Sequence, residues 1–257
     1  MNEKWAITGS HGFLGEHLVS KLGGAYRMDR VPQNPKGIDI YADLASFGNM
    51  SNQTVYSEIY RANTMRVINQ LERIEDTDYK AYLYVSTSSV TLPHQTYYSA
   101  SKKATEEFIA LYAREKNKAV VSIRPYSITG VREQSQHLIP KLIDSCLHGT
   151  KMDFVVDPVH DFLDVDDFTD ALLLISQSAQ NYKGRIFAVG SGKQYTNAQV
   201  LEIVEKVTGK KANVNVVKSM RAYDTIDWQA DTTLMYSLGW QPKKSLEDSI
   251  REMVANA

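Results

Sequence analysis

Tyr98 and Lys102 are the two side chains whose types and spacing are best suited to moving a proton. They stand four positions apart at the start of a segment with helical periodicity, so they share one face of the expected helix. A tyrosine with an ordinary pKa of about 10 is a poor base at neutral pH, but an adjacent ammonium favours the phenolate. The chain holds 15 tyrosines, so this spacing needs support from the elements around it.

A glycine-rich turn near the N-terminus gives the first support. Gly9, Gly12 and Gly15 lie between an expected strand and an expected helix. There they allow a tight turn, close approach of backbone N–H groups to a pyrophosphate, and close packing of helix on strand. The sequence therefore predicts a dinucleotide site, and the other expected contacts of the turn are His11, Phe13 and Leu14.

Asp29 ends the second expected strand, where a carboxylate accepts hydrogen bonds from the adenosine ribose hydroxyls. It would repel a 2′-phosphate, so the sequence favours NAD(H) over NADP(H) as the cofactor. Arg27 and Arg30 flank it, however, and either side chain could reverse that preference by pairing with the phosphate.

A hydroxyl-rich turn, Ser86 to Ser89, follows a strand between the glycine turn and Tyr98. Ligands contact parallel sheets at the carboxyl ends of their strands. One of these hydroxyls can hydrogen-bond the substrate oxygen with which Tyr98 exchanges its proton. The alternative is a solvated loop, which the order of the glycine turn, this turn and the Tyr98/Lys102 pair disfavours.

The elements that position these residues alternate along the chain. Apolar runs typical of strands occupy 5–8, 25–28, 38–44, 81–86, 119–123 and 186–189. Helical periodicity occupies 12–22, 59–74, 98–115, 136–147, 167–178 and 196–207. This alternation predicts an α/β protein with a Rossmann-type, doubly wound parallel sheet covered by helices on both faces.

The connection after the second strand is short. Only residues 30–37 separate it from the next strand, and Pro32 and Pro35 leave no room for a helix. We therefore expect the usual third strand to be missing, with 39–46 serving as the fourth. In a rival alignment Asp43 and Leu44 would contact adenine, but no segment would then supply the fourth strand.

Composition argues against several partners. The net charge of −1 comes from 29 basic and 30 acidic residues without a long run of one sign, so nucleic acid is not expected. The longest aliphatic run, 171–175, is too short to cross a membrane, and the N-terminus lacks a signal-peptide pattern. A single cysteine, Cys146, excludes an internal disulfide and suggests the cytoplasm.

Four aspartates, Asp161, Asp164, Asp166 and Asp167, precede an expected helix. They are compatible with a metal site or with capping of the helix, and we favour capping, with no metal.

With these motifs in place, the sequence resembles the extended short-chain dehydrogenase/reductases, the NAD-dependent epimerase/dehydratase family that acts on nucleotide sugars. The likeness runs nearly end to end and includes 39–46, 86–90, 124–130, 160–167, 221–224 and 238–242. It implies an NAD(P)-binding Rossmann domain of residues 1–129 and 159–189. A small substrate-binding lobe of 130–158 and 190–257 would complete the chain, and a homodimer could form through the helix that bears Tyr98.

The resemblance also implies residue roles. The catalytic residues are Thr87, Tyr98 and Lys102. The cofactor contacts are Gly9, His11, Gly12, Phe13, Leu14, Gly15, Asp29, Arg30, Leu44, Ala45, Asn63, Tyr98 and Lys102. The substrate contacts are Ser88, Ser127, Arg132, His137 and Arg221, with Ser127 and His160 departing from the family's common asparagine and arginine.

Ser88 and Ser89 stand where the family's dehydratases carry Asp and Glu. Neither hydroxyl is a general acid near neutral pH, so we expect oxidoreductase chemistry by hydride transfer and neither dehydration nor decarboxylation. A nucleotide 4-keto-sugar reductase is favoured, because a trimmed adenine pocket suits an exchangeable cofactor. A nucleotide-sugar 4-epimerase is the alternative. A non-catalytic NAD(P)-sensing protein is less favoured because Thr87, Tyr98 and Lys102 are all retained.

Overall fold

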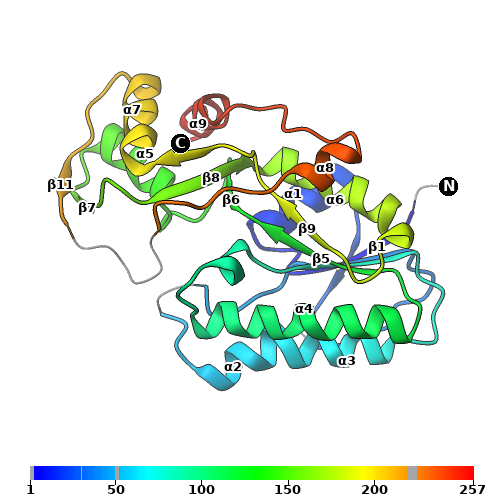
Figure 1. Cartoon of the computed structure of the whole chain (residues 1–257). Coiled ribbons are helices and arrows are strands. Elements are labelled where there is room, and N and C mark those ends of the chain that lie inside the picture. Colours follow the sequence, from blue (N-terminus) through cyan, green and yellow to red (C-terminus); the bar gives the residue numbers. More distant parts are fainter. Residues whose placement is uncertain (1–2, 30, 50–51, 219–224) are drawn as a thin grey trace. The chain divides into compact units, whose positions relative to one another are not determined.

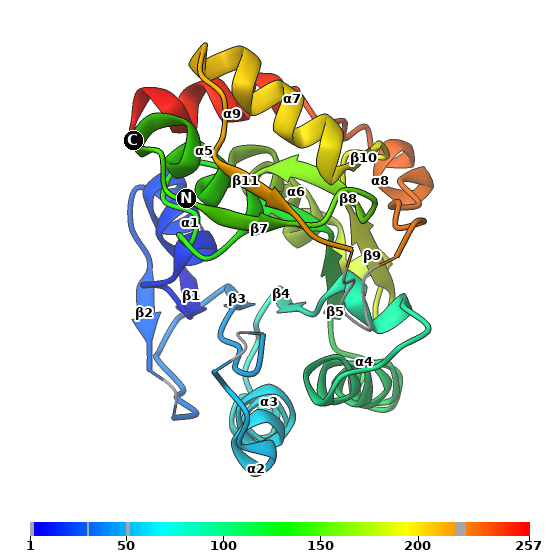
Figure 2. The ribbon, with the colours of Figure 1, turned by 90° about the vertical axis from the view of Figure 1, so that its left-hand side faces the viewer.

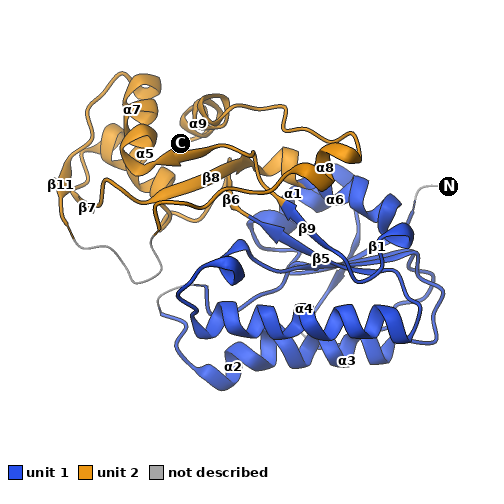
Figure 3. Ribbon diagram, viewed as in Figure 1, with its two compact units in different colours: residues 1–125, 169–188 blue, residues 126–168, 189–257 orange. Residues whose placement is uncertain are grey.

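The computed structural model describes residues 3–29, 31–49, 52–218 and 225–257. The chain divides into two compact units (Figure 3). Unit 1 comprises Met1–Pro125 and Thr169–Ala188, and unit 2 comprises Tyr126–Phe168 and Val189–Ala257. Segments 126–129 and 159–168, which the sequence analysis placed in the dinucleotide-binding domain, lie in unit 2. Within the described ranges, no helix has the length and apolar character needed to cross a membrane.

Unit 1 is built on a six-stranded sheet with the order β2-β1-β3-β4-β5-β9 (Figure 2). The pairs β1/β2, β1/β3, β3/β4 and β4/β5 are all parallel. The strands are β1 (Trp5–Thr8), β2 (Tyr26–Met28), β3 (Ile40–Asp43), β4 (Ala81–Val85), β5 (Val120–Pro125) and β9 (Ile186–Val189). The predicted Rossmann-type α/β fold is confirmed, because each expected strand forms within a few residues of its predicted bounds.

The shortened connection has the predicted effect on the sheet. β3 pairs directly with β1, opposite β2, and so takes the place of the fourth strand. In the described part of the chain, no strand lies beyond β2. The connecting loop is instead held by a helix, since Gln70 bonds both the N–H and the C=O of Gln33, at 2.8 and 2.7 Å.

Helices cover both faces of this sheet (Figures 1 and 2). α1 (Phe13–Leu22) and the unit 1 part of α6 (Val165–Ser178) lie on one face. α3 (Arg66–Arg73) and α4 (Tyr97–Glu115) lie on the other, where α2 (Tyr56–Tyr60) and the π-helical turn η1 (Arg61–Met65) lead directly into α3. The core on this second face includes Tyr41, Val67, Leu71, Tyr82, Tyr84, Ile109 and Tyr112.

Unit 2 has two small sheets and its own core. β6 (Ser127–Thr129), β8 (Val159–Asp164) and β10 (Gln194–Thr196) form one sheet, and β7 (Met152–Phe154) pairs with β11 (Val214–Val216). The helices are α5 (Leu138–His148), α7 (Asn197–Thr208), α8 (Thr233–Ser237) and α9 (Leu246–Ala255). Apolar residues of α5, α7 and α9 form the core, which also buries Cys146.

A buried ion pair lies at the end of β3. Asp43 and Arg66 are 1% and 7% exposed, and the guanidinium bonds both carboxylate oxygens, at 2.6 and 2.9 Å. The same carboxylate accepts bonds from the hydroxyls of Tyr82 at 2.5 Å and Thr8 at 2.9 Å. Burial favours a raised pKa for Asp43, but these partners hold the pKa below its ordinary value. Both carboxylate oxygens of Asp43 already accept hydrogen bonds from buried protein groups. The rival alignment, in which Asp43 contacts adenine, is therefore disfavoured.

Replacing Asp43 with Asn should destabilise the protein by roughly 3–5 kcal/mol, because it leaves the Arg66 charge buried without a counterion. Urea unfolding measures this loss. The double variant Asp43→Leu with Arg66→Met should recover most of the stability, since it removes both charges. In the native chain the contribution of Asp43 is present above pH ~4 and is lost as pH falls through its lowered pKa. A double variant no more stable than Asp43→Asn would contradict this account.

Candidate active site

The glycine turn packs tightly against the segment that follows β3. Gly9 has a φ of +66°, and a Cβ there would lie 2.8 Å from the backbone N of Ala45 and 2.9 Å from the carbonyl carbon of Leu44. A Cβ on Gly15 would collide with the backbone of Gly9 and Ser10. The chain therefore requires glycine at both positions, and Leu44 and Ala45 border the turn.

The first turn of α1 is arranged to bind an anion. Gly12 is the N-cap residue and provides no side-chain hydrogen bond to the helix. The N–H groups of Phe13, Leu14 and Gly15 begin the helix, where backbone donors have no intrahelical acceptor and the helix dipole is positive. This geometry fits the pyrophosphate of a dinucleotide.

The predicted ribose contacts lie at the end of β2. Asp29 is exposed, and its carboxylate accepts one bond from Gln33 Nε2 at 3.1 Å. His11 is also exposed, with Nδ1 lying 3.3 Å from Nη1 of Arg27. Arg30 lies outside the described residues.

Asn63 is buried, and its side chain is occupied within the protein. Its side-chain amide accepts a hydrogen bond from the N–H of Phe47 at 3.0 Å. The same amide donates to the C=O of Phe47 at 2.7 Å and to the Ser101 hydroxyl at 2.9 Å. Its own carbonyl accepts bonds from Tyr84 and Thr105. Asn63 thus fastens the loop after β3 to α4 at the π turn, a feature that helical periodicity does not reveal.

Tyr98 and Lys102 do share a face of α4, which begins with a capping box formed by Thr96 and Ser99. Lys102 is 1% exposed and donates a hydrogen bond to the carbonyl of Val85, at 2.8 Å. Its ammonium lies 6.0 Å from the centre of the Tyr98 ring. The helix therefore brings both side chains to the carboxyl end of β4.

The hydroxyl turn after β4 forms a short 3₁₀ helix, η2 (Ser88–Thr91), with Thr87 as its N-cap. The Thr87 hydroxyl accepts a bond from the Ser89 N–H at 3.2 Å and lies 3.0 Å from the Ser89 hydroxyl. Ser88, a predicted substrate contact, is buried.

The ionisation of the pair depends strongly on burial. Burial raises the pKa of Tyr98 to about 12, against the opposing effect of hydrogen bonds with the hydroxyls of Ser46 and Thr87. Burial lowers the pKa of Lys102 to about 7, although the Asp43 carboxylate acts in the opposite direction. A neutral Tyr98 is a proton donor. Ser46 was missed by the sequence analysis; its signal was its place directly after Leu44 and Ala45.

The predicted substrate contacts beyond residue 125 lie in unit 2. The Ser127 hydroxyl is 3.2 Å from Nδ1 of His160. His137 begins α5 and pairs with Glu133, with Nδ1 and Oε1 2.9 Å apart. Arg132 is exposed on a turn. Arg221 lies outside the described residues.

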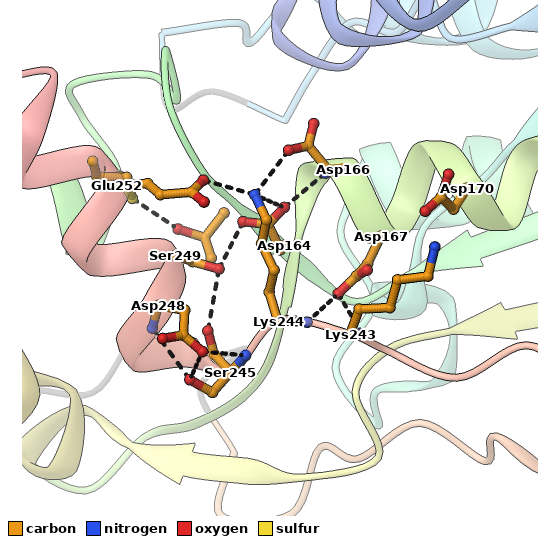
Figure 4. Close-up of polar contacts among 12 residues, drawn as sticks. Asp164, Asp166, Asp167, Asp170, Lys243, Lys244, Ser245, Asp248, Ser249 and Glu252 are labelled. Carbon is orange, nitrogen blue, oxygen red and sulfur yellow. Dashed lines mark hydrogen bonds and ion pairs between the residues drawn. The ribbon is translucent and has the colours of Figure 1, made fainter.

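Asp164 and the two aspartates in the first turn of α6, Asp166 and Asp167, are hydrogen-bonded within the protein (Figure 4). Lys244 Nζ lies 2.8 Å from Asp166 and 3.4 Å from Asp164. Asp167 accepts two backbone N–H bonds, and Asp161 binds the backbone of the 191–192 turn. No group with the composition of a metal site occurs in the described part of the chain.

The lowered pKa of Lys102 makes a testable contribution to stability. Between about pH 7 and pH 10 the unfolded chain binds a proton that native Lys102 releases, so the free energy of unfolding should rise with pH. The rise is at most ~1.4 kcal/mol per pH unit. Urea unfolding at about pH 7 and pH 9 should show a smaller rise in Lys102→Met. Lys103→Met, which alters an exposed neighbour, should behave like the native chain. If the free energy of unfolding rises equally with pH in all three proteins, the lowered pKa of Lys102 is refuted.

Comparison with known proteins agrees with this geometry. The model of the NAD dependent epimerase/dehydratase family matches residues 27–190. CDP-abequose synthase from Salmonella muenchen is 23% identical, over 99% of this chain and 98% of the relative. GDP-6-deoxy-D-mannose reductase from Pseudomonas aeruginosa is 21% identical, over 100% and 97%. A UDP-N-acetylglucosamine 4-epimerase from Methanobrevibacter ruminantium has a similar fold, with a TM-score of 0.88 and 19% identity over 100% of this chain and 98% of that one.

Other similar proteins are named as dehydratases and 4-epimerases, and similar solved structures contain NAD or NADPH. The match covers more than half of the chain and includes Thr87, Tyr98 and Lys102. The chain belongs to the NAD dependent epimerase/dehydratase family, whose members are oxidoreductases and epimerases of the extended short-chain dehydrogenase/reductase type.

Proposed function

We propose that this protein is an NAD(P)-dependent reductase that transfers hydride to a nucleotide-activated 4-keto-sugar. The observation that carries the proposal is the set of groups around the Tyr98 hydroxyl. A neutral Tyr98 has the Thr87 hydroxyl as a hydrogen-bond partner and the buried Lys102 beside its ring, and the turn after Thr87 offers serines where a dehydratase needs carboxylic acids. Such a site can move one proton to or from an oxygen that gains or loses a hydride.

The proposed mechanism assigns one task to each side chain. The bound nicotinamide dinucleotide supplies the hydride. As negative charge develops on the substrate oxygen, Tyr98 donates its proton there. The Thr87 hydroxyl accepts from the Ser89 N–H and lies beside the Ser89 hydroxyl, and its own hydrogen would turn to the same oxygen when substrate binds. Lys102 then stabilises the tyrosinate by its positive charge.

A reductase is favoured over a 4-epimerase by the edge of the sheet. An epimerase must retain its cofactor through both hydride transfers, whereas a reductase exchanges it at each turnover. Asp29 is exposed, and β2 forms the sheet edge in the described chain. With less protein around the adenine, the cofactor should be held less tightly and exchange more readily.

The test is incubation with NADH or NADPH and a panel of nucleotide 4-keto-sugars, followed by absorbance of the reduced nicotinamide. We expect stoichiometric consumption with one member of the panel. Tyr98→Phe should lower kcat by roughly 10²–10⁴-fold with cofactor binding intact, because only the proton donor is removed. Tyr97→Phe is the matched control, since Tyr97 is 54% exposed and stacks on Tyr56.

Two outcomes would overturn the reductase proposal. Tightly bound NAD in the purified protein, together with interconversion of nucleotide-sugar epimers, would identify a 4-epimerase. A biological effect that persists fully in Tyr98→Phe would identify a non-catalytic NAD(P)-binding protein.

We also propose a homodimer through the outer face of α2, η1 and α4. This face exposes a set of large apolar side chains: Tyr56, Tyr60, Met65, Tyr97 and Leu111. Tyr56 and Tyr97 stack on one another, and exposed apolar side chains that adjoin in this way mark interaction sites. A second copy could pair its own α4 with this one about a two-fold axis, which is the commonest symmetry of soluble dimers.

Leu111→Glu should shift the protein from dimer to monomer in light scattering, because it places a carboxylate on the apolar face. Val216→Glu is the control, as Val216 is 62% exposed on β11, a strand of unit 2. A native chain that is monomeric in light scattering would contradict the proposed dimer. Equal effects of the two substitutions on the oligomeric state would also contradict it.

A further inference from the structure

Arg27 on β2 lies beside the glycine turn, and Glu16 on α1 holds it there. Nη1 of Arg27 is 2.9 Å from Oε1 of Glu16, and Nη2 is 3.2 Å from Oε2. Nη1 also donates to the carbonyl of Ser10 at 2.7 Å and lies 3.3 Å from Nδ1 of His11. The guanidinium is therefore fastened to a carboxylate by two parallel bonds and to the turn itself by a third.

This placement bears on the part of a dinucleotide that distinguishes NADP from NAD. The adenosine ribose binds between the glycine turn and the end of the second strand. Arg27 lies on β2 and Asp29 directly follows its last residue, so both belong to that strand end. A phosphate on the ribose 2′-oxygen would need a cation there, and the nearby guanidinium is already neutralised by Glu16.

The pair is only partly shielded from solvent. The side chain of Arg27 is 33% exposed and that of Glu16 is 29% exposed. An anion that enters this corner can therefore reach the guanidinium, provided that the carboxylate releases it.

We propose that Glu16 sets the choice of cofactor in favour of NAD(H) by holding Arg27 away from a 2′-phosphate. The proposal rests on the proposed function, in which the glycine turn binds a nicotinamide dinucleotide. With Glu16 in place, a 2′-phosphate meets two carboxylates, those of Glu16 and Asp29, and an arginine whose charge is matched. Without the Glu16 charge, Arg27 becomes a cationic, two-pronged donor for that phosphate.

The experiment measures direct binding of NADH and NADPH by nicotinamide fluorescence and calorimetry, without substrate. The native chain should bind NADH more tightly than NADPH. Glu16→Gln keeps the size of the side chain and should tighten NADPH binding by about tenfold or more, with less than about threefold change for NADH. Adding Arg27→Met to Glu16→Gln should abolish the gain, because the cation is then missing.

Glu115→Gln is the matched control. Glu115 also pairs with an arginine, Arg114, but on the exposed end of α4, so its loss should leave both affinities unchanged. Thermal unfolding of each variant verifies that the fold is retained.

The other results separate the two proposals. If the native chain binds NADH but Glu16→Gln leaves the ratio of NADPH to NADH affinity unchanged, the role of Glu16 is refuted and the proposed function stands. A gain that persists without Arg27 also refutes it, since repulsion alone would then explain the preference. If the native chain binds neither nucleotide, the proposed function itself fails and the inference fails with it.

Discussion

The carboxylate of Asp43 joins three elements of unit 1 at the end of β3. It bonds Thr8 at the end of β1, Tyr82 on β4 and the guanidinium of Arg66 on α3. Its position determines where the chain goes next, because Thr8 Oγ in turn accepts from the Ala45 N–H. The segment 44–46 is thereby set against Gly9 on one side and brings Ser46 to Tyr98 on the other. The glycine turn and Tyr98 thus share one buried anchor.

The same anchor affects the charge on Lys102. The lysine is almost fully buried, and desolvation lowers its pKa to about 7 although the carboxylates of Asp43 and Glu106 favour the protonated form. Arg66 opposes them as a charge of the same sign. A buried ion pair adds little net stability to a protein. It does produce a strong local electric field, because little solvent screens its charges. Asp43 and Arg66 therefore contribute to the electrostatics around Lys102 as well as to the geometry of the neighbouring segment.

The loss of the third strand is accommodated locally. The loop 31–37 is bonded to α3 through Gln70 and Arg73, so it is anchored to that helix. β3 pairs with β1 on the side opposite β2, and Gly9 packs on Leu44 and Ala45, so these contacts do not depend on the missing strand. A cofactor site can thus retain its pyrophosphate end while its adenine end becomes more open.

The sequence by itself determined the alternation of strands and helices, the missing third strand, and the class of chemistry. These follow from local signals: the spacing of glycines at one turn, prolines in a connection too short for a helix, and Tyr98 and Lys102 four apart on one helix. Only the tertiary structure decided what lies beside them. Asp43 and Arg66 are 23 positions apart, Glu16 and Arg27 are 11 apart, and Ser46 and Tyr98 are farther still. No periodicity links such pairs, because they meet only when separate strands and helices pack. The π turn at Asn63 was hidden for a related reason, since its bonds to Phe47 and Ser101 join segments that come together only in the folded chain.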